Sequence, residues 1–234
     1  MRAILHCHSK FSYDSKIKID QIIDFCVNFE INFLIISDHD TIKGSLEAAK
    51  KIKLQGLDII CPPAAEYKTD LGDIILVGLT YELERPTFDE LVEISNNNDN
   101  CRLLLPHAYH DHLNIEYLAN NVDFIEIFNS RCSSNENEKA KKLAKSFKKL
   151  TYASPDAHTL PEYKNCIISY DIDDIIHWTK ILEKNWKYYT KQKTSLCQIY
   201  ISTIIKSLKI KSFNVLIKSL IKICIFCIFY KKYK

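Results

Sequence analysis

The segment INFLIISDHDTIKGSLEAAKKIKLQGLDIICPPAAEY, residues 31–67, contains the repeating unit that decides the fold. Its apolar run INFLIIS (31–37) predicts a buried strand, and TIKGSLEAAKKIKLQG (41–56) predicts a helix that ends at Gly56. The run LDIICPPAAEY (57–67) predicts the next strand. A strand, a helix and a strand in succession form the unit from which parallel sheets and α/β barrels are built.

The same alternation extends in both directions from this unit. Before it, RAILH (2–6) predicts a strand and DQIIDFCVNF (20–29) an amphipathic helix opened by Asp20. After it come predicted strands at 72–79, 101–107, 122–129 and 150–158, with helices at 87–95 and 136–150. The chain is therefore expected to form an α/β fold with a parallel sheet or barrel.

Composition narrows the class of protein without naming a partner. At 234 residues, 47% apolar and 26% charged, the chain suits a globular fold with a large core. A net charge of +3 is too small to indicate nucleic acid. Six lysines in 139–149 could form such a surface, but a solvated face with Leu143, Ala144 and Phe147 turned inward is the simpler interpretation.

The cysteines and the amino-terminal segment indicate the cellular compartment. Nine cysteines are scattered without the spacing of a disulfide framework, and no signal peptide precedes the first apolar stretch. We therefore expect a cytoplasmic protein.

The composition changes near residue 190. From Leu196 to Tyr230 the chain is strongly apolar, and its only charges are lysines, of which three share one helical face: Lys211, Lys218 and Lys222. The uninterrupted run 223–230 is shorter than the ~20 residues needed to cross a bilayer. We predict a domain at 1–190 and a helical extension at 191–234 that packs on it or on another copy, with peripheral membrane contact as the alternative. Cys224 and Cys227 form a CxxC pair, a weak metal or redox signal without a second pair.

Histidines follow the predicted strands. Seven of the eight lie at or just after strand ends: His6, His8, His39, His107, His110, His112 and His158. Carboxylates accompany them: Asp14, Asp38, Asp40, Glu66 and Asp156. The carboxyl ends of parallel strands gather on one face, so these side chains are expected to meet in one cleft. Neutral imidazoles and bridging carboxylates suit Zn²⁺, Mn²⁺ or Fe²⁺ and indicate a site for two or three ions.

Each element of this pattern also has a simpler interpretation. The pair His6 and His8 could be a coincidence of packing, and Asp40 or Thr41 could cap a helix that begins near Ile42. Several independent coincidences would have to fall at successive strand ends, and this conjunction favours the metal site.

Six segments in order resemble the PHP family, named for polymerase and histidinol phosphatase, and most closely its small stand-alone members. They are HCHSKFSYDS (6–15), SDHDTIKG (37–44), AEYKTDLGDIILVGL (65–79), LPHAYH (105–110), DFIEIFNSR (123–131) and SPDAH (154–158). The resemblance covers about residues 1–170. It implies a distorted seven-stranded, TIM-like β/α barrel with a metal cluster at the carboxyl ends of its strands, followed here by the apolar, lysine-containing extension.

The resemblance also implies a ligand set. His6 and His8 would bind one ion, shared with Asp156 and a bridging Glu66. Asp14, His39 and His158 would bind another, and His107 would join Glu66 at a further ion. Asp38 would orient a ligand histidine.

Three positions depart from the family pattern. The usual Gly-Ser-Asp-Ala-His is Ser-Pro-Asp-Ala-His here, with Pro155 in the loop before the ligands, and Ala108 replaces a proline after His107. Many members also place a histidine in the strand after the glutamate, where this chain has Ile75, Leu76 and Leu79. Two tightly bound ions and a weaker third are therefore expected.

Clustered divalent ions activate water and neutralise phosphoryl charge, so phosphate ester hydrolysis is the expected reaction. The substrate would be a small phosphomonoester or a nucleotide, with His158, His110 or Arg131 stabilising the phosphate or the leaving group. An exonuclease of short oligonucleotides is a second hypothesis, although no groove of aromatic and basic residues supports it. A metal-binding domain without catalysis is the third.

Overall fold

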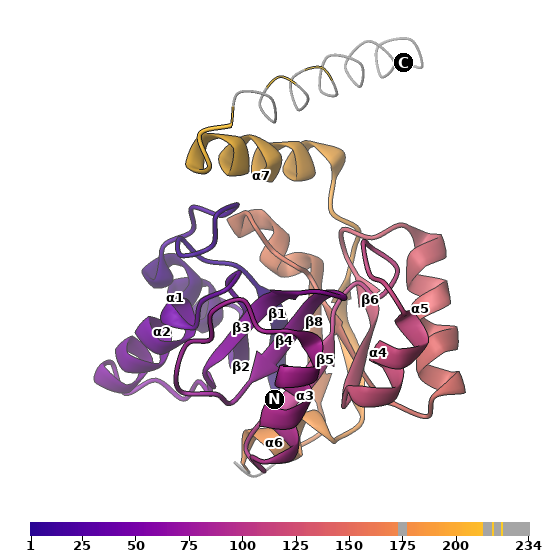
Figure 1. Cartoon of the computed structure of the whole chain (residues 1–234). Helices are drawn as coiled ribbons and strands as arrows, with labels where there is room; N and C mark the ends of the chain where they lie inside the picture. Colours follow the sequence, from indigo (N-terminus) through magenta and orange to yellow (C-terminus); the bar gives the residue numbers. More distant parts are fainter. Residues whose placement is uncertain (173–176, 213–216, 218–220, 222–234) are drawn as a thin grey trace.

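The computed structural model describes residues 1–172, 177–212, 217 and 221, and shows the expected alternation of strands and helices up to residue 154 (Figure 1). The elements of this part are β1 (Arg2–Cys7), α1 (Ile19–Asn28), β2 (Ile31–Ile36), α2 (Lys43–Leu54), β3 (Ala64–Thr69), β4 (Gly72–Val77), α3 (Phe88–Asn96), β5 (Arg102–Leu105), α4 (Ile115–Asn121), β6 (Phe124–Asn129), α5 (Ser134–Ser146) and β7 (Leu150–Ser154). Five elements follow: η1 (Leu160–Asn165), β8 (Cys166–Tyr170), α6 (Trp178–Leu182), β9 (Trp186–Lys191) and α7 (Leu196–Lys209).

The strands form two mixed sheets, in the orders β2-β1-β8-β9 and β3-β4-β5-β6-β7. The pairs β1–β2, β5–β6 and β6–β7 are parallel, as expected. The expectation of a wholly parallel arrangement was wrong. Only Asp70 and Leu71 separate β3 from β4, and so short a connection permits only antiparallel pairing. Strand β8 also runs antiparallel to β1 and β9.

Isolated bridges join the two sheets at two seams. At one seam the amide of His8 donates to the carbonyl of Ala157 (2.8 Å), beside a bridge between Cys7 and Ala157. At the other seam His39 is bridged to Glu66. A further bridge, between Phe33 and Ile60, lies at this second seam. Among the described residues, the two sheets are joined only by such isolated bridges, so the closed seven-stranded barrel is not confirmed. Both seams join segments that carry predicted metal ligands.

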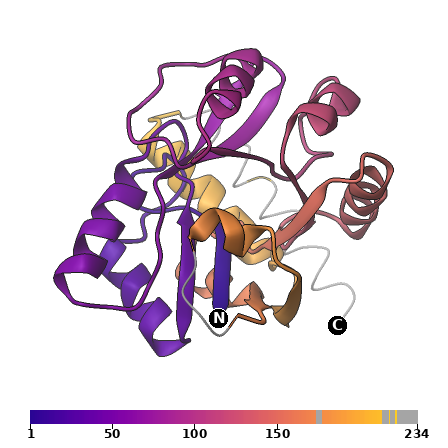
Figure 2. The ribbon, with the colours of Figure 1, turned by 90° about the horizontal axis from the view of Figure 1, so that it is seen from below.

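Three apolar clusters hold the layers together. The middle cluster lies between the two sheets and includes Leu5, Phe33, Leu104 and Tyr152, all fully buried. A second cluster packs β1 and β2 against α1 and α2, and a third packs the larger sheet against α3, α4 and α5. Seen from below, at 90° to the view of Figure 1, the helices surround the sheets, with α1 and α2 on one side and α4 and α5 on the other (Figure 2).

Helix α5 shows the expected division of its faces. Leu143 and Ala144 are buried and Phe147 packs against the same cluster, while the lysines face outward. A capping box of Ser133 and Glu136 fixes where this helix begins. Helix α1 begins one residue earlier than expected, at Ile19, with Lys18 as its N-cap and Asp20 in its first turn.

Within the predicted extension, the structure describes one long helix, α7, while the apolar helix expected up to residue 230 is not confirmed. Helix α7 (Leu196–Lys209) lies across the end of the molecule opposite α6 (Figure 1). Most of 213–234, including Cys224 and Cys227, lies outside the described residues. The boundary at 190/191 stays a prediction. Among the residues searched, no helix combines the length and apolarity needed to cross a membrane.

Candidate metal centre

The end of β1 supplies the first two histidines. Alternation along a strand turns His6 and His8 to the same side, where both are fully buried and their Nε2 atoms lie 3.2 Å apart. Cys7 points the other way, and its thiol donates to the carbonyl of Ile35. The strand therefore presents two imidazoles to one point.

All eight predicted ligands converge at the carboxyl end of the sheets. They form three overlapping groups, within each of which one ligand atom per residue lies within 4.8 Å of the others: His8, Asp14, His39 and His158; His6, Glu66 and His107; His6, His8 and Asp156. His6 and His8 each belong to two groups. Residues as distant in sequence as Asp14 and His158 are 3.1 Å apart (Oδ2 to Nε2). The arrangement suits neighbouring ions that share ligands.

Glu66 occupies the middle of these groups. Its Oε1 is 2.9 Å from Nε2 of His107. Its buried Oε2 has no hydrogen-bond partner and lies 3.4 Å from three imidazole nitrogens: Nε2 of His6, Nε2 of His8 and Nδ1 of His39. A buried carboxylate oxygen without a hydrogen bond is costly. Divalent cations between this oxygen and the imidazoles would satisfy all four groups, so the donor set fits the expected ions.

Charge at the centre is strongly coupled. Burial alone would raise the pKa of Glu66, but His6 and His39 hold it well below its ordinary value. Burial would also raise the pKa of Asp14, but His158 and His39 outweigh burial and lower this pKa strongly. Desolvation and the neighbouring His158 lower the pKa of His8 to about 3. The carboxylates are therefore ionised and His8 is neutral at pH 7, the forms that bind cations.

Metal uptake is expected to release protons at pH 7 and to strengthen toward pH 9. Desolvation lowers the pKa of His39, but Glu66 and Asp14 outweigh it and raise the pKa to about 9. The pKa of His107 is about 9 because Glu66 similarly outweighs desolvation. Desolvation lowers the pKa of His6 too, but Asp156 and Glu66 outweigh it and raise that pKa well above its ordinary value. Ions must displace these protons, since they bind neutral imidazole. Calorimetric titration with Mn²⁺ in two buffers of different ionisation enthalpy counts the protons released, and none at pH 7 would contradict this assignment.

Of these histidines, His39 and His107 predict an opposite trend for the metal-free protein. Their raised folded-state pKa values stabilise the metal-free fold fully below about pH 6.5, the ordinary value for histidine. That contribution is lost as the pH rises through about 9. Thermal unfolding of the chelated protein across this range measures the loss.

Glu126 is a residue of this centre that the sequence reasoning missed. It is fully buried on β6, with Oε1 3.5 Å from Nδ1 of His6 and Oε2 accepting the amide of His107 at 2.7 Å. Ser154 and Asn129 also donate to its carboxylate. Glu126 thus orients two ligand histidines from behind. A signal was present, because a charged residue interrupts the apolar strand FIEIFN and needs buried partners.

Asp38 has another role than the one expected. Its carboxylate accepts the amide and the hydroxyl of Ser9, each at 2.6 Å, and none of its described hydrogen bonds reaches a ligand histidine. Burial raises its pKa to about 6 despite these two bonds. Gly44 leaves room for the pair, since a Cβ there would lie 1.9 Å from Oδ2 of Asp38. Asp38 therefore fixes the loop that follows His8. At the neighbouring helix start the hydroxyl of Thr41 accepts the amide of Lys43. The N-cap of α2 is nevertheless Ile42, without a side-chain cap, so neither Asp40 nor Thr41 caps this helix.

The three predicted catalytic residues lie at different depths. His158 is buried within the first ligand group. The side chain of His110 is 63% exposed at the rim, with its ring edge-on to His107 at 5.9 Å. Arg131 does not point freely into the centre: Nη1 donates to Glu162 (2.8 Å) and Nη2 to Ser202 (2.6 Å). Glu162 accepts the amide of His158, so Arg131 braces the loop that carries this ligand.

Removing this brace is expected to destabilise the protein. Arg131→Ala leaves the buried Glu162 without its cation, which costs about 3 kcal/mol, or roughly 6–12 °C in melting temperature for a chain of this size. Arg131→Lys keeps the charge, so its melting temperature should lie between those of wild type and Arg131→Ala. Calorimetric melting measures the effect. An unchanged melting temperature together with lost hydrolysis would instead assign Arg131 to the substrate.

The departures from the family pattern leave the ligands in place. Asp156 and His158 reach the centre beyond Pro155, whose carbonyl accepts the hydroxyl of Ser130 at 2.5 Å. Among the residues that the structure describes, no further histidine completes the group of His6, Glu66 and His107. The ring of His112 is 5.5 Å from that of His107, but its nitrogens face the carbonyls of His110 and Asp73 at 2.9 and 2.8 Å. The group of His6, Glu66 and His107 therefore keeps the small ligand set expected of a weaker site.

The ordered ligands and their placement agree with comparison to known proteins. A model of the PHP domain matches residues 5–207. The chain belongs to the PHP family. No curated protein matches this PHP chain in sequence. The match reaches α7, so this helix lies within the region shared with the family.

Solved structures share the PHP fold at low identity. PsfC from Pseudomonas syringae is 12% identical with a TM-score of 0.59, and the alignment covers 90% of this chain and 98% of PsfC. A two-domain protein from Bacteroides vulgatus, described as containing a predicted PHP-like metal-dependent phosphoesterase, is 11% identical with a TM-score of 0.65, covering 82% and 65%. An amidohydrolase from Chromobacterium violaceum with bound sulfate and no metal is 14% identical with a TM-score of 0.53, covering 67% and 87%.

Proposed function

We propose that this PHP protein is a metal-dependent phosphoesterase that hydrolyses a small phosphomonoester or a nucleotide. The observation that supports the proposal most strongly is the sharing of His6 and His8 among three ligand groups around Glu66. Such sharing brings cations close enough to act on one phosphoryl group. The phosphoesterase named among the structural neighbours and the sulfate bound in another are consistent with this chemistry.

Bound divalent ions, Mn²⁺, Zn²⁺ or Fe²⁺, would supply an activated water and neutralise phosphoryl charge. Residues of the chain itself hold the ligand side chains and orient them toward the ions. Glu126 fixes His6 and the backbone of His107, and Arg131 with Glu162 fixes the loop of His158. His110 stands at the rim beside His107, where it can donate a proton to the departing alkoxide. We propose His158 first as a ligand, because it faces Asp14 and Asp156.

Hydrolysis assays with added Mn²⁺ test the proposal. The substrates are p-nitrophenyl phosphate, a nucleoside 3′,5′-bisphosphate and a short RNA, and elemental analysis of the same preparation reports the bound metals. Turnover of either small ester supports the proposed function. Turnover of RNA alone would assign the chain as a nuclease, and full metal content without any turnover would leave a metal-binding domain without catalysis.

A further inference from the structure

Helix α7 is amphipathic in the opposite sense to an ordinary surface helix. Its buried side chains are Ser202 and Ser207, at 2% and 1% exposure. Its exposed side chains include Ile201 at 44% and Leu208 at 52%, two positions seven residues apart on one face. A helix that only covers a domain would bury its apolar face. The face of α7 that contains Ile201 and Leu208 is called the outer face below.

Polar contacts hold α7 in this orientation. Ser202 accepts a hydrogen bond from Arg131 at 2.6 Å. Lys209, the last residue of α7, donates to the carbonyls of Lys10 and Ser12, each at 2.7 Å. Turning the outer face inward would break all three bonds. The apolar exposure is therefore built into the way α7 is attached to the loops around the metal centre.

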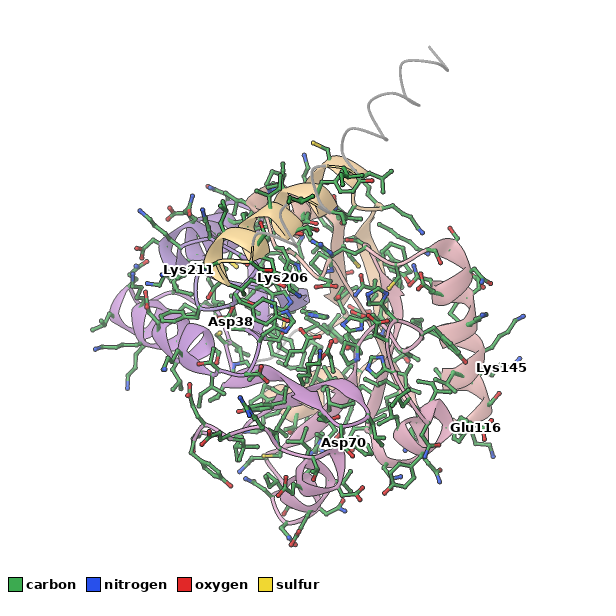
Figure 3. All side chains as sticks on the ribbon, turned by 45° about the horizontal axis from the view of Figure 1, so that its top comes forward. Asp38, Asp70, Glu116, Lys145, Lys206 and Lys211 are labelled. Atoms are coloured by element: carbon green, nitrogen blue, oxygen red, sulfur yellow. The ribbon has the colours of Figure 1, made fainter. Side chains whose placement is uncertain are left out.

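Lys206 belongs to the same inward side. It follows Ser202 by one helical turn, and its ammonium lies 4.6 Å from the centre of the Tyr13 ring. Tyr13 is itself stacked on His39, with ring centres 4.4 Å apart. In a view with the top of the molecule tilted forward, Lys206 lies on α7 toward the middle of the molecule (Figure 3). The inner side of the helix thus carries Ser202, Lys206 and Lys209, while Ile199, Ile204 and Ile205 are half-buried.

The chain around α7 is entirely basic. Residues 184–234 contain twelve lysines and no aspartate or glutamate. Of these, Lys209 and Lys211 are exposed at the end of α7, beside the exposed Leu208 and Ile210. The two further described residues, Ile217 and Ile221, are exposed as well. Exposed apolar side chains flanked by unopposed cations are complementary to a bilayer with anionic headgroups.

We propose that the outer face of α7 docks on the surface of an anionic lipid bilayer. Ile201 and Leu208 would enter the boundary between headgroups and acyl chains, while Lys211 meets the phosphates and Lys209 keeps its bonds to the carbonyls of Lys10 and Ser12. Since the inner face is attached to the loops of the metal centre, docking leaves those contacts in place. Binding combines apolar burial with electrostatic attraction, so it should need anionic lipid and weaken in salt.

Vesicle sedimentation of the full chain tests this surface. Wild type should pellet with phosphatidylcholine vesicles that contain phosphatidylglycerol, less at high salt, and remain soluble with phosphatidylcholine alone. The double variant Ile201→Ser and Leu208→Ser should bind the anionic vesicles at least about tenfold more weakly, from the loss of two apolar side chains from the interface. The matched control is Val27→Ser and Leu54→Ser, which removes exposed apolar side chains from α1 and α2.

Circular dichroism and metal content should be unchanged in both double variants, because all four side chains are exposed. Equal vesicle binding by wild type and the α7 variant would overturn the proposal. A second result would also overturn the proposal: wild type stays in solution with anionic vesicles, and light scattering shows self-association that the α7 variant lacks. The outer face would then bind another copy of the chain. Neither readout depends on turnover, so the outcome is independent of the proposed hydrolysis.

Discussion

Glu66→Gln is expected to lose bound metal and about a thousandfold in hydrolysis. Glutamine fills the same volume, but it has no charge, and its amide nitrogen donates hydrogen bonds and cannot bind a cation. The substitution removes a carboxylate whose two oxygens face His6, His8, His39 and His107, histidines that between them belong to all three ligand groups. Metal ions supply several kcal/mol of transition-state stabilisation, and a loss of about 4 kcal/mol corresponds to roughly a thousandfold in rate.

Elemental analysis and Mn²⁺-dependent hydrolysis of p-nitrophenyl phosphate measure these two losses on one preparation. Glu116→Gln, an exposed carboxylate at the start of α4, is the matched control and should behave as wild type. Circular dichroism separates loss of metal from loss of fold. A Glu66→Gln protein that is folded and keeps the wild-type metal content would show that Glu66 does not bridge the ions.

The ligands were predictable because the signal for each one is local. His8 and Glu66 stand at the ends of apolar runs, and the carboxyl ends of neighbouring strands meet wherever the strands are parallel. The same rule brings in partners that are distant in sequence, such as His39 and His158, without an accurate prediction of the path between the elements. Glu126 was missed because it lies inside a strand, where the same rule assigns residues to the core.

The arrangement of the sheets was less accessible from the sequence. Strand β8 pairs with both β1 and β9, and its pairing with β1 joins residue 2 to residue 169, a contact that no local pattern contains. Strand β9 did carry a signal, since WKYYTK is rich in the aromatic and β-branched residues that favour strands. The orientation of α7 was the hardest feature. Periodicity predicts a helix and an apolar face, but it assigns that face to the core, whereas Ser202 and Lys209 attach the opposite face here.

His8→Ala and His107→Ala are expected to separate the strong sites from the weak one. His8 belongs to two ligand groups and His107 to one, which has only three members. After dialysis, His107→Ala should retain the tightly bound ions of wild type, while His8→Ala should lose them. Saturating one site to 100 times its dissociation constant adds about 2.7 kcal/mol, or roughly 5–11 °C in melting temperature.

The rise in melting temperature on adding Mn²⁺ to chelated protein therefore distinguishes the variants. Wild type and His107→Ala should both show the rise from the tight sites, and His8→Ala should show little of it. Because alanine leaves a cavity at a fully buried position, His8→Gln provides a second variant that keeps volume and a hydrogen-bonding group. If His107→Ala instead lost as much metal as His8→Ala, the group around Glu66 would be one cooperative site, in which no ion binds tightly without the third.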